Sequence, residues 1–226
     1  MKFYKEERST IPLSPLLEEE ETNLAGFYVM PDMFYIKQKS RTSHEEERTP
    51  VESLSDLLIA GSEVQQKIYL SADAGFGKTS FSKYLAIIWS QVHFPDSNRE
   101  LFQEEELKAL ANFDFLFLIL LRDCTDVCSV DDMIKQKIIK KFHRPDSKYP
   151  IQEVLDREKC LIILDGLDEW THPNSCFDKV EKIPHRYTCG KNCVILTTTR
   201  PWKLGVSNLK TSDINKKIRS EERRVG

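Results

Sequence analysis

The sequence lacks long apolar segments, a strong excess of either charge and any stretch typical of a secretion signal. Its most apolar run, residues 113–121, is interrupted by Asp114 and is far shorter than the roughly 20 residues that a membrane-spanning helix needs. Residues 1–8 are charged and no apolar core follows them, so a signal peptide is not indicated. The formal net charge of -3 gives no sign of a general nucleic-acid-binding protein. We therefore expect no clear nucleic-acid or membrane binding.

The chain also gives no sign of a disulfide framework, although it contains six cysteines. Such frameworks stabilise short secreted domains, and this chain is neither short nor secretory in character. Cys160 introduces an apolar strand, which suits a buried free thiol. We therefore predict reduced cysteines and a cytoplasmic location.

The cysteine spacing gives little support for a zinc site. The pairs Cys124/Cys128 and Cys189/Cys193 are each spaced within the range found for zinc ligands. Cys193, however, opens an apolar strand that we expect to be buried, which favours structural thiols over metal ligands. Two histidines of the same region are expected at the surface: His172 and His185.

The first informative stretch is residues 67–80, where a short apolar strand is followed by Ala-Asp-Ala-Gly-Phe-Gly-Lys-Thr and a helix. Gly75 and Gly77 permit backbone conformations that a β-carbon would block, so successive N–H groups can turn towards an anion. The N-terminus of the following helix adds partial positive charge. This is the pattern of a phosphate-binding loop, in which Lys78 would reach the β- and γ-phosphates and Thr79 would bind Mg²⁺.

One position departs from the usual loop pattern, because Ala72 stands where glycine is expected. Alanine is the least intrusive replacement if that position keeps a negative φ, and a poor one otherwise. The residues that we predict to bind nucleotide in this loop and the start of its helix are Ala72, Asp73, Ala74, Gly75, Phe76, Gly77, Lys78, Thr79 and Ser80.

The second informative stretch is residues 161–169, where four apolar residues are followed by Asp-Gly-Leu-Asp-Glu. In an open α/β sheet, ligands bind beyond the carboxyl ends of the strands, so Asp165 is expected at the same edge as the phosphate loop. There it would hold Mg²⁺ together with Thr79. Asp168 and Glu169 are candidates to orient or deprotonate an attacking water, or else they cap the following turn.

The third informative stretch is residues 193–201, an apolar strand followed by three threonines and Arg-Pro. A guanidinium group matches phosphate oxygens, so Arg200 is a candidate to contact a γ-phosphate. The alternative is that it pairs with an acid.

The remaining pattern places helices between these strands. Residues 78–93 form the clearest helix, with an apolar face that ends before Pro95. Residues 113–121 read as a strand covered on both faces, as in a parallel sheet. Helices are also expected at residues 51–59, 100–112, 131–142 and 151–158.

Taken together, these three stretches resemble the NACHT nucleotide-binding module of NOD-like receptors and related STAND-class signalling proteins. Residues 72–80 resemble its Walker A motif, residues 161–169 its Walker B motif and residues 197–201 its sensor 1 element. The resemblance extends over about residues 28–205, and the order of the three motifs makes it more specific than a phosphate loop alone.

The resemblance implies a three-layer α/β P-loop NTPase with a mainly parallel sheet flanked by helices. Its expected cofactors are ATP or ADP with Mg²⁺, with slow Mg²⁺-dependent ATP hydrolysis at most. It also implies a nucleotide-dependent switch for self-association, or association with other NACHT-type modules, in innate immune signalling.

The same resemblance leads us to expect an incomplete C-terminus. The family continues into a fifth core strand, a helical subdomain and a winged helix, and none of these is recognisable in residues 202–226. We expect a flexible lead over residues 1–24 and a strand and helix pre-region over residues 25–66. The P-loop core is expected over residues 67–205, followed by a polar tail over residues 206–226 that is disordered or non-native.

Two other functional classes remain open. A small-substrate kinase would use the same loop but adds an arginine-rich lid, which is not evident here. A truncated nucleotide-binding fragment without turnover is the other alternative. A signalling GTPase is disfavoured because its Asn-Lys-x-Asp base-reading motif is absent.

Overall fold

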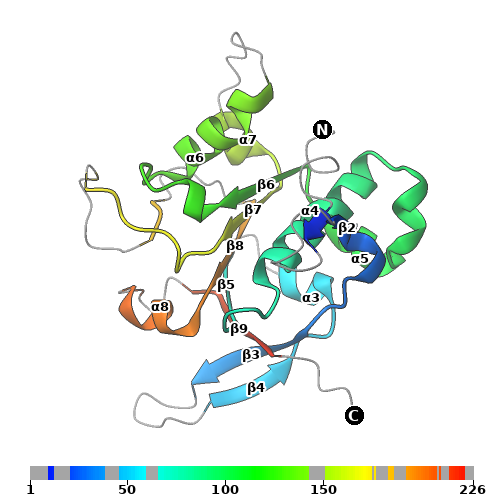
Figure 1. Ribbon diagram of the computed structural model, residues 1–226, viewed down its shortest axis with the longest axis horizontal. Coiled ribbons are helices and arrows are strands. Elements are labelled where there is room, and N and C mark those ends of the chain that lie inside the picture. Colours follow the sequence, from blue (N-terminus) through cyan, green and yellow to red (C-terminus); the bar gives the residue numbers. More distant parts are fainter. Residues whose placement is uncertain are drawn as a thin grey trace.

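The computed structural model describes residues 10–12, 21–38, 46–59, 66–142, 151–174, 176, 183–185, 192–207, 209 and 214–221. Over these residues the protein is an α/β fold with a seven-stranded mixed sheet in the order β4-β3-β9-β5-β8-β7-β6 (Figure 1). The strands are β3 (Asp32–Gln38), β4 (Glu46–Pro50), β5 (Gln66–Ser71), β6 (Phe115–Leu120), β7 (Cys160–Asp165), β8 (Cys193–Thr199) and β9 (Lys216–Glu221). The predicted α/β class with a mainly parallel sheet flanked by helices is confirmed at this level.

Helices and short helical turns connect these strands. The helices are α2 (Leu24–Phe27), α3 (Leu54–Leu58), α4 (Lys78–His93), α5 (Glu104–Leu110), α6 (Val130–Lys137), α7 (Ile151–Arg157) and α8 (Pro201–Val206). The 3₁₀ turns are η1 (Ser97–Leu101), η2 (Leu121–Asp123) and η3 (Ile139–Phe142). Among the described residues, no helix has both the length and the apolar character needed to cross a membrane.

The five strands from β9 to β6 run parallel, whereas β3 pairs antiparallel with both β9 and β4. Strand β8 lies between β5 and β7, with Tyr69 paired to Thr197 and Leu164 paired to the same residue. Because parallel strands end at the same edge of a sheet, the segments after Ser71, Asp165 and Thr199 meet there.

Helices cover both faces of the parallel strands, and consecutive strand residues alternate between two hydrophobic clusters. On β7, Leu161 and Ile163 pack in the first cluster and Ile162 and Leu164 in the second. The first cluster includes side chains of α3, α4 and α5, and the second includes those of α6 and α7. The result is three layers, with the core on either side of the sheet.

The prediction of a disordered tail over residues 206–226 is wrong for Lys216–Glu221. These residues form β9, which pairs parallel with β5 and antiparallel with β3. The strand was missed because it is mostly charged, and only Ile218 and Ser220 of it are buried. A fifth parallel strand therefore follows residues 193–199, contrary to the sequence prediction.

The prediction of a flexible lead over residues 1–24 is also wrong where the structure describes that segment. Thr10–Pro12 forms β1, which pairs antiparallel with β2 (Glu21–Asn23). Leu24 is completely buried in the first hydrophobic cluster, so the segment is anchored at its end. In the predicted strand and helix pre-region, Glu46–Pro50 forms the strand β4.

Candidate nucleotide-binding site

The predicted phosphate loop, residues 72–77, connects β5 to α4 at the carboxyl edge of the sheet. Ala72 is buried, and its N–H donates to the carbonyl oxygen of Thr199 at 3.1 Å. This bond continues the pairing of β5 with β8 by one residue. The substitution of alanine for the usual glycine therefore leaves the base of the loop attached to the sheet.

Two glycines give the loop its shape. Gly75 and Gly77 have φ values of 83° and 69°, in the left-handed region that residues with a β-carbon avoid. Gly77 is also the N-cap of α4, and its carbonyl accepts from Phe81 N–H at 2.8 Å. The loop thus leads directly into a helix of 16 residues, whose first N–H groups lack helical partners and favour an anion.

Replacing Gly77 by alanine is expected to lower the free energy of unfolding by about 1 kcal/mol, because a β-carbon disfavours a left-handed φ. A β-carbon there has nothing within 4 Å, so the effect is backbone strain without a clash. Chemical denaturation measures the change. Gly205→Ala in α8 is the control, since it also has open space but no positive φ, and its stability should rise slightly. Equal stability of Gly77→Ala and wild type would contradict this account.

The side chain of Lys78 folds back over the loop. Its Nζ donates to the carbonyl oxygens of Ala72 and Asp73 at 2.8 and 2.7 Å. Burial lowers the pKa of the Lys78 ammonium from its ordinary value, and the charge of Asp168 opposes that effect. The ammonium is therefore held at the loop by carbonyl groups that a phosphate oxygen can replace.

Asp165 ends β7 and is almost completely buried, with three hydroxyl groups around its carboxylate. Thr79 Oγ1 donates to its Oδ2 at 2.7 Å, while Ser82 Oγ and Thr198 Oγ1 donate to its Oδ1 at 2.9 and 2.7 Å. Thr198 Oγ1 also accepts from Gly166 N–H at 2.9 Å. The predicted metal ligands Thr79 and Asp165 are thus brought together from α4 and β7.

Asp168 and Arg200 are paired to each other. Arg200 Nε lies 2.9 Å from Asp168 Oδ2, and the N–H of Arg200 donates to Asp168 Oδ1 at 3.1 Å. The Asp168 side chain is only 5% exposed, whereas that of Arg200 is 45% exposed. In the structure, Arg200 therefore pairs with an acid, which was the alternative to contact with a phosphate. That acid is Asp168, which was predicted to orient an attacking water.

The other predicted site residues differ in how exposed they are. Asp73, Ala74 and Gly75 are exposed, and Phe76 and Ser80 are partly buried. Glu169 is exposed, its N–H donates to the Gly166 carbonyl in a turn, and its side chain lies beside Gly166. This position agrees with the turn-capping alternative for Glu169 better than with a catalytic role.

The oxygen groups at this edge fit a Mg²⁺ ion. Mg²⁺ takes oxygen ligands at about 2.0–2.1 Å in an octahedron, so two adjacent ligands lie about 2.9 Å apart. Thr79 Oγ1 and Asp165 Oδ2 are 2.7 Å apart, which is close to that separation. A hydroxyl and a carboxylate are also among the ligands that Mg²⁺ prefers.

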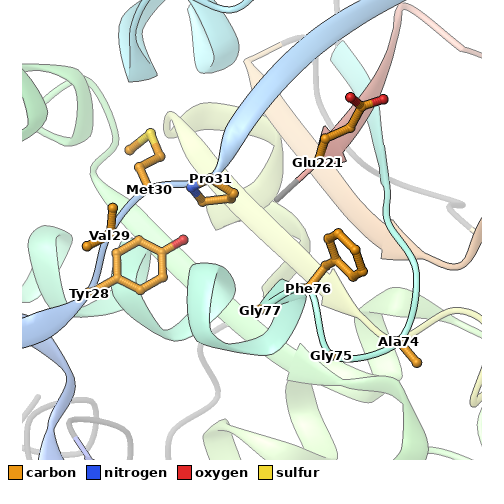
Figure 2. Close-up of a pocket in the computed structure, with 9 residues that line it drawn as sticks. All are labelled: Tyr28, Val29, Met30, Pro31, Ala74, Gly75, Phe76, Gly77 and Glu221. Atoms are coloured by element: carbon orange, nitrogen blue, oxygen red, sulfur yellow. The ribbon is translucent and has the colours of Figure 1, made fainter. Parts of the chain in front are cut away.

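A pocket of about 410 Å³ opens beside the loop (Figure 2). One wall is the segment from Tyr28 to Pro31, and the opposite wall is Ala74 to Gly77, with Glu221 at the end of β9. Pockets for small ligands typically enclose roughly 300–1,000 Å³ and are lined mainly by apolar groups. The pocket therefore has the size and character expected for an organic group attached to phosphates held in the loop.

The Tyr28 side chain of this largely apolar wall carries a polar atom. Its ring stacks on Tyr84 with centroids 4.3 Å apart, and its buried hydroxyl has no hydrogen-bond partner among the described residues. Burial raises the pKa of the phenol, so the group is a neutral hydroxyl. An unpaired buried hydroxyl is costly, and this one is not exposed to the pocket.

Several residues of this site were missed from the sequence. Ser82 lies three residues after Thr79 on α4, so helical periodicity alone puts both on one face and would have suggested it. Thr198 lies in the stretch 193–201 that was singled out from the sequence, but no local pattern distinguishes it from Thr197 and Thr199. Tyr28, between α2 and β3, and Glu221, at the end of β9, line the pocket beside the loop but are far from it in sequence.

Neither a scan against protein-family models nor a search of curated proteins finds a match to this chain. The geometry of the loop, the hydroxyl groups around Asp165 and the adjoining pocket therefore carry the functional argument.

Proposed function

We propose that this protein binds ATP or ADP with Mg²⁺ at residues 72–77, as the nucleotide-dependent switch module of a NACHT-type signalling protein. The observation that carries the proposal is the contact between Thr79 Oγ1 and Asp165 Oδ2 at 2.7 Å, beside a glycine-shaped loop at the start of α4. A phosphate cradle and a pair of hard oxygen ligands are the two parts that a magnesium nucleotide requires.

Different groups of the site bind the phosphates, the metal ion and the nucleoside. N–H groups of residues 75–79 and the Lys78 ammonium hold the phosphate oxygens, and Thr79 and Asp165 hold Mg²⁺. Mg²⁺ held by Thr79 and Asp165 would supply positive charge that offsets the charge of the phosphates. The apolar wall from Tyr28 to Pro31 receives the nucleoside.

Arg200 gives the site its response to the γ-phosphate. It has two possible partners, the carboxylate of Asp168 and a phosphate oxygen, and its 45% exposed side chain can exchange one for the other. A triphosphate would draw Arg200 from Asp168, whereas a diphosphate leaves the ion pair in place. This exchange links the bound nucleotide to the segment after β7, and through it to self-association or association with other NACHT-type modules.

Nucleotide binding without turnover is a second candidate, favoured by one observation. The Asp168 carboxylate is bound by both the side chain and the backbone N–H of Arg200. It therefore contacts Arg200 instead of orienting a water molecule. Release of inorganic phosphate from ATP distinguishes the two. A phosphate release rate equal to that without protein would leave binding as the function.

Calorimetric titration with ATP and with ADP, each with and without Mg²⁺, tests the proposed function. We expect one nucleotide per chain and tighter binding when Mg²⁺ is present, since the metal adds contacts to Thr79 and Asp165. Lys108→Ala on the exposed face of α5 is the control and should bind as the wild type does. The proposal fails if the folded wild-type protein binds neither nucleotide under either condition.

A further inference from the structure

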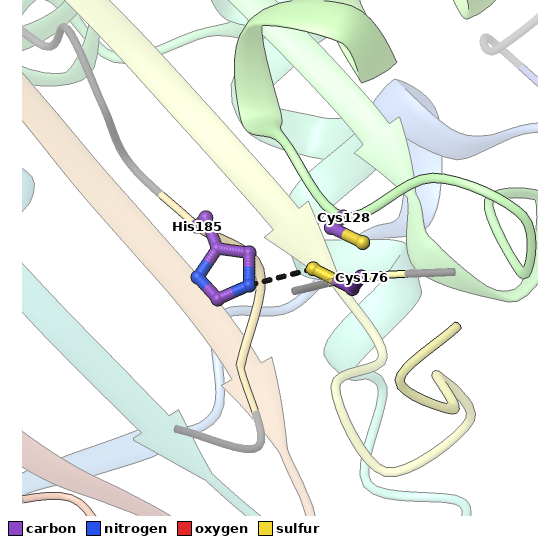
Figure 3. Close-up of side chains that lie close together, drawn as sticks. All are labelled: Cys128, Cys176 and His185. Carbon is purple, nitrogen blue, oxygen red and sulfur yellow. Dashed lines mark hydrogen bonds between the residues drawn. The ribbon is translucent and has the colours of Figure 1, made fainter. Parts of the chain in front are cut away.

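A second cluster of reactive side chains lies outside the nucleotide site. Cys128, Cys176 and His185 each offer one ligand atom, and these atoms all lie within 4.8 Å of one another (Figure 3). His185 Nε2 is 2.9 Å from Cys176 Sγ. Contrary to the sequence prediction of a surface position, His185 is only 7% exposed. The cluster therefore combines a buried imidazole and a buried thiol with a second, partly exposed thiol.

Backbone hydrogen bonds hold these groups together. The N–H of His185 donates to the carbonyl of Cys128 at 2.7 Å, and Val130 N–H donates to the carbonyl of His185 at 3.0 Å. This short parallel bridge ties the loop before α6 to the segment after β7. Cys176 is placed by a turn in which its N–H donates to the Pro173 carbonyl at 3.1 Å. The ligand atoms thus sit on a backbone that is already arranged.

His172 lies next to this cluster, with its ring against that of His185, and is the candidate for a fourth ligand. Its Nδ1 lies 3.1 Å from the Pro173 carbonyl oxygen, so Nδ1 carries the proton and Nε2 has a free lone pair. Nε2 is buried and has no hydrogen-bond partner among the described residues. Histidines that bind metals typically donate their other ring N–H to such a carbonyl.

The separation of the His172 and His185 rings is close to that of two imidazoles on one metal ion. Their centroids are 5.4 Å apart and the rings are inclined at 80°. Two imidazoles bound through nitrogen to a tetrahedral zinc at about 2.0–2.1 Å have centroids about 5 Å apart.

We propose that Cys128, Cys176, His185 and His172 bind a structural Zn²⁺ ion. Two thiolates and two imidazoles form one of the usual tetrahedral zinc sets, and soft sulfur ligands disfavour Mg²⁺. In such a site a sulfur and a nitrogen lie about 3.6 Å apart, whereas His185 Nε2 and Cys176 Sγ are 2.9 Å apart and the three clustered ligand atoms lie within 4.8 Å of one another, so the side chains would shift when the metal binds. The site shares Cys128 with the pairing considered from the sequence, but its other members are different. Cys189 lies outside the described residues.

Burial argues against a different use of the same groups. A cysteine and histidine pair can act as a nucleophile, but that role needs access for a substrate. Cys176 and His185 are 8% and 7% exposed, and a second thiol, Cys128, lies within reach of both. A buried thiol and a partly exposed one that converge with imidazoles fit a structural metal site better than a nucleophile.

The zinc ion would fix the segment that follows the acids of β7. Trp170 packs edge-on against His172 with ring centroids 5.4 Å apart, and its Nε1 donates to the Cys124 carbonyl at 3.0 Å. Asp168 lies two residues before Trp170. Metal binding would therefore stabilise the loop that positions Asp168, whether or not nucleotide binds.

The zinc content of the purified full chain tests this site. We expect about one zinc ion per chain by elemental analysis, and X-ray absorption with two sulfur neighbours at about 2.3 Å and two nitrogen neighbours at about 2.0–2.1 Å. Removal of the metal by a chelator should lower the thermal midpoint, and added Zn²⁺ should restore it. A folded wild-type chain that neither contains zinc nor takes it up would overturn the proposal.

Single variants identify the ligands. Cys128→Ser, Cys176→Ser and His185→Asn should each lose zinc, and His172→Asn should bind it more weakly. The matched control is Cys124→Ser, because its thiol is also buried and donates to the Leu120 carbonyl, a bond that a serine hydroxyl can make. If a ligand variant fails to fold, Co²⁺ substitution in the wild type gives the same information through its thiolate absorption bands. Wild-type zinc content in Cys128→Ser, or a Co²⁺ spectrum without thiolate bands, would contradict the assignment.

Discussion

Replacing Lys78 by alanine is expected to weaken ATP binding about 100-fold. In the structure, Lys78 Nζ is already held at the loop by two carbonyl oxygens at 2.8 and 2.7 Å. Exchange of those partners for phosphate oxygens gives charge-assisted hydrogen bonds worth at least about 1.5 kcal/mol each. The loss of two such bonds is about 3 kcal/mol, which corresponds to a factor of about 100 in the dissociation constant. Calorimetric titration with ATP and Mg²⁺ measures it.

The Lys78 variant should remain folded, because the side chain is only half-buried and the carbonyls that it leaves can be reached by water. Thermal unfolding verifies this before the titration. Lys108→Ala removes a lysine of the exposed surface and serves as the control for charge alone. Similar dissociation constants for Lys78→Ala and wild type would mean that nucleotide, if bound, lies elsewhere.

Replacing Asp165 by asparagine is expected to remove most of the gain in ATP affinity that Mg²⁺ provides. The amide keeps the shape of the side chain, and its oxygen can still accept from Ser82 and Thr198 at the position of Oδ1. The NH₂ group replaces Oδ2 beside Thr79, so a negatively charged metal ligand is lost. A charge-assisted contact of about 1.5–3 kcal/mol predicts at least a tenfold smaller Mg²⁺ effect. Paired titrations with and without Mg²⁺ measure this difference.

Two comparisons make the Asp165 result specific. Asp156→Asn, an exposed acid of α7, should leave the Mg²⁺ effect unchanged. Asp168→Asn should retain it as well, while any ATP turnover falls, because Asp168 is assigned to water and to Arg200. An undiminished Mg²⁺ effect in Asp165→Asn would remove Thr79 and Asp165 as metal ligands.

The parts of the fold that were predictable from the sequence have strong local patterns. Residues 78–93 follow helical periodicity and form α4, and the apolar runs before Asp165 and Arg200 form β7 and β8. Such patterns reflect burial on one or both faces of an element, which depends little on distant residues. The approach of Thr79 to Asp165 also followed, since parallel strands end at one edge.

The parts that were not predictable depend on distant partners. Strand β9 has four charged residues among six, yet it lies inside the sheet. Lys216 Nζ donates to the carbonyls of Asp56 and Leu57, and Lys217 and Arg219 lie within 4.0 Å of Glu46. No local pattern reveals these partners, so the strand reads as a solvated tail.

The cysteine and histidine cluster was missed for the same reason. Sequence spacing suggested pairs that are close along the chain, whereas Cys128 comes from the loop before α6 and His185 from the segment after β7. Their approach is set by the bridge between Ser129 and His185. Spacing identifies a metal site only when its ligands share a local turn.

The position of β9 also has a consequence for the order in which the protein is synthesised. Ser71, the last residue of the strand before the phosphate loop, donates its hydroxyl to the carbonyl of Ile218, 147 residues later. Until that late segment leaves the ribosome, β5 has an open edge on one side and pairs only with β8 on the other. Contacts so distant in sequence form slowly. The newly made chain thus acquires a complete support for its loop only at the end of translation of this region, and truncation before Lys216 should leave that edge open to other chains.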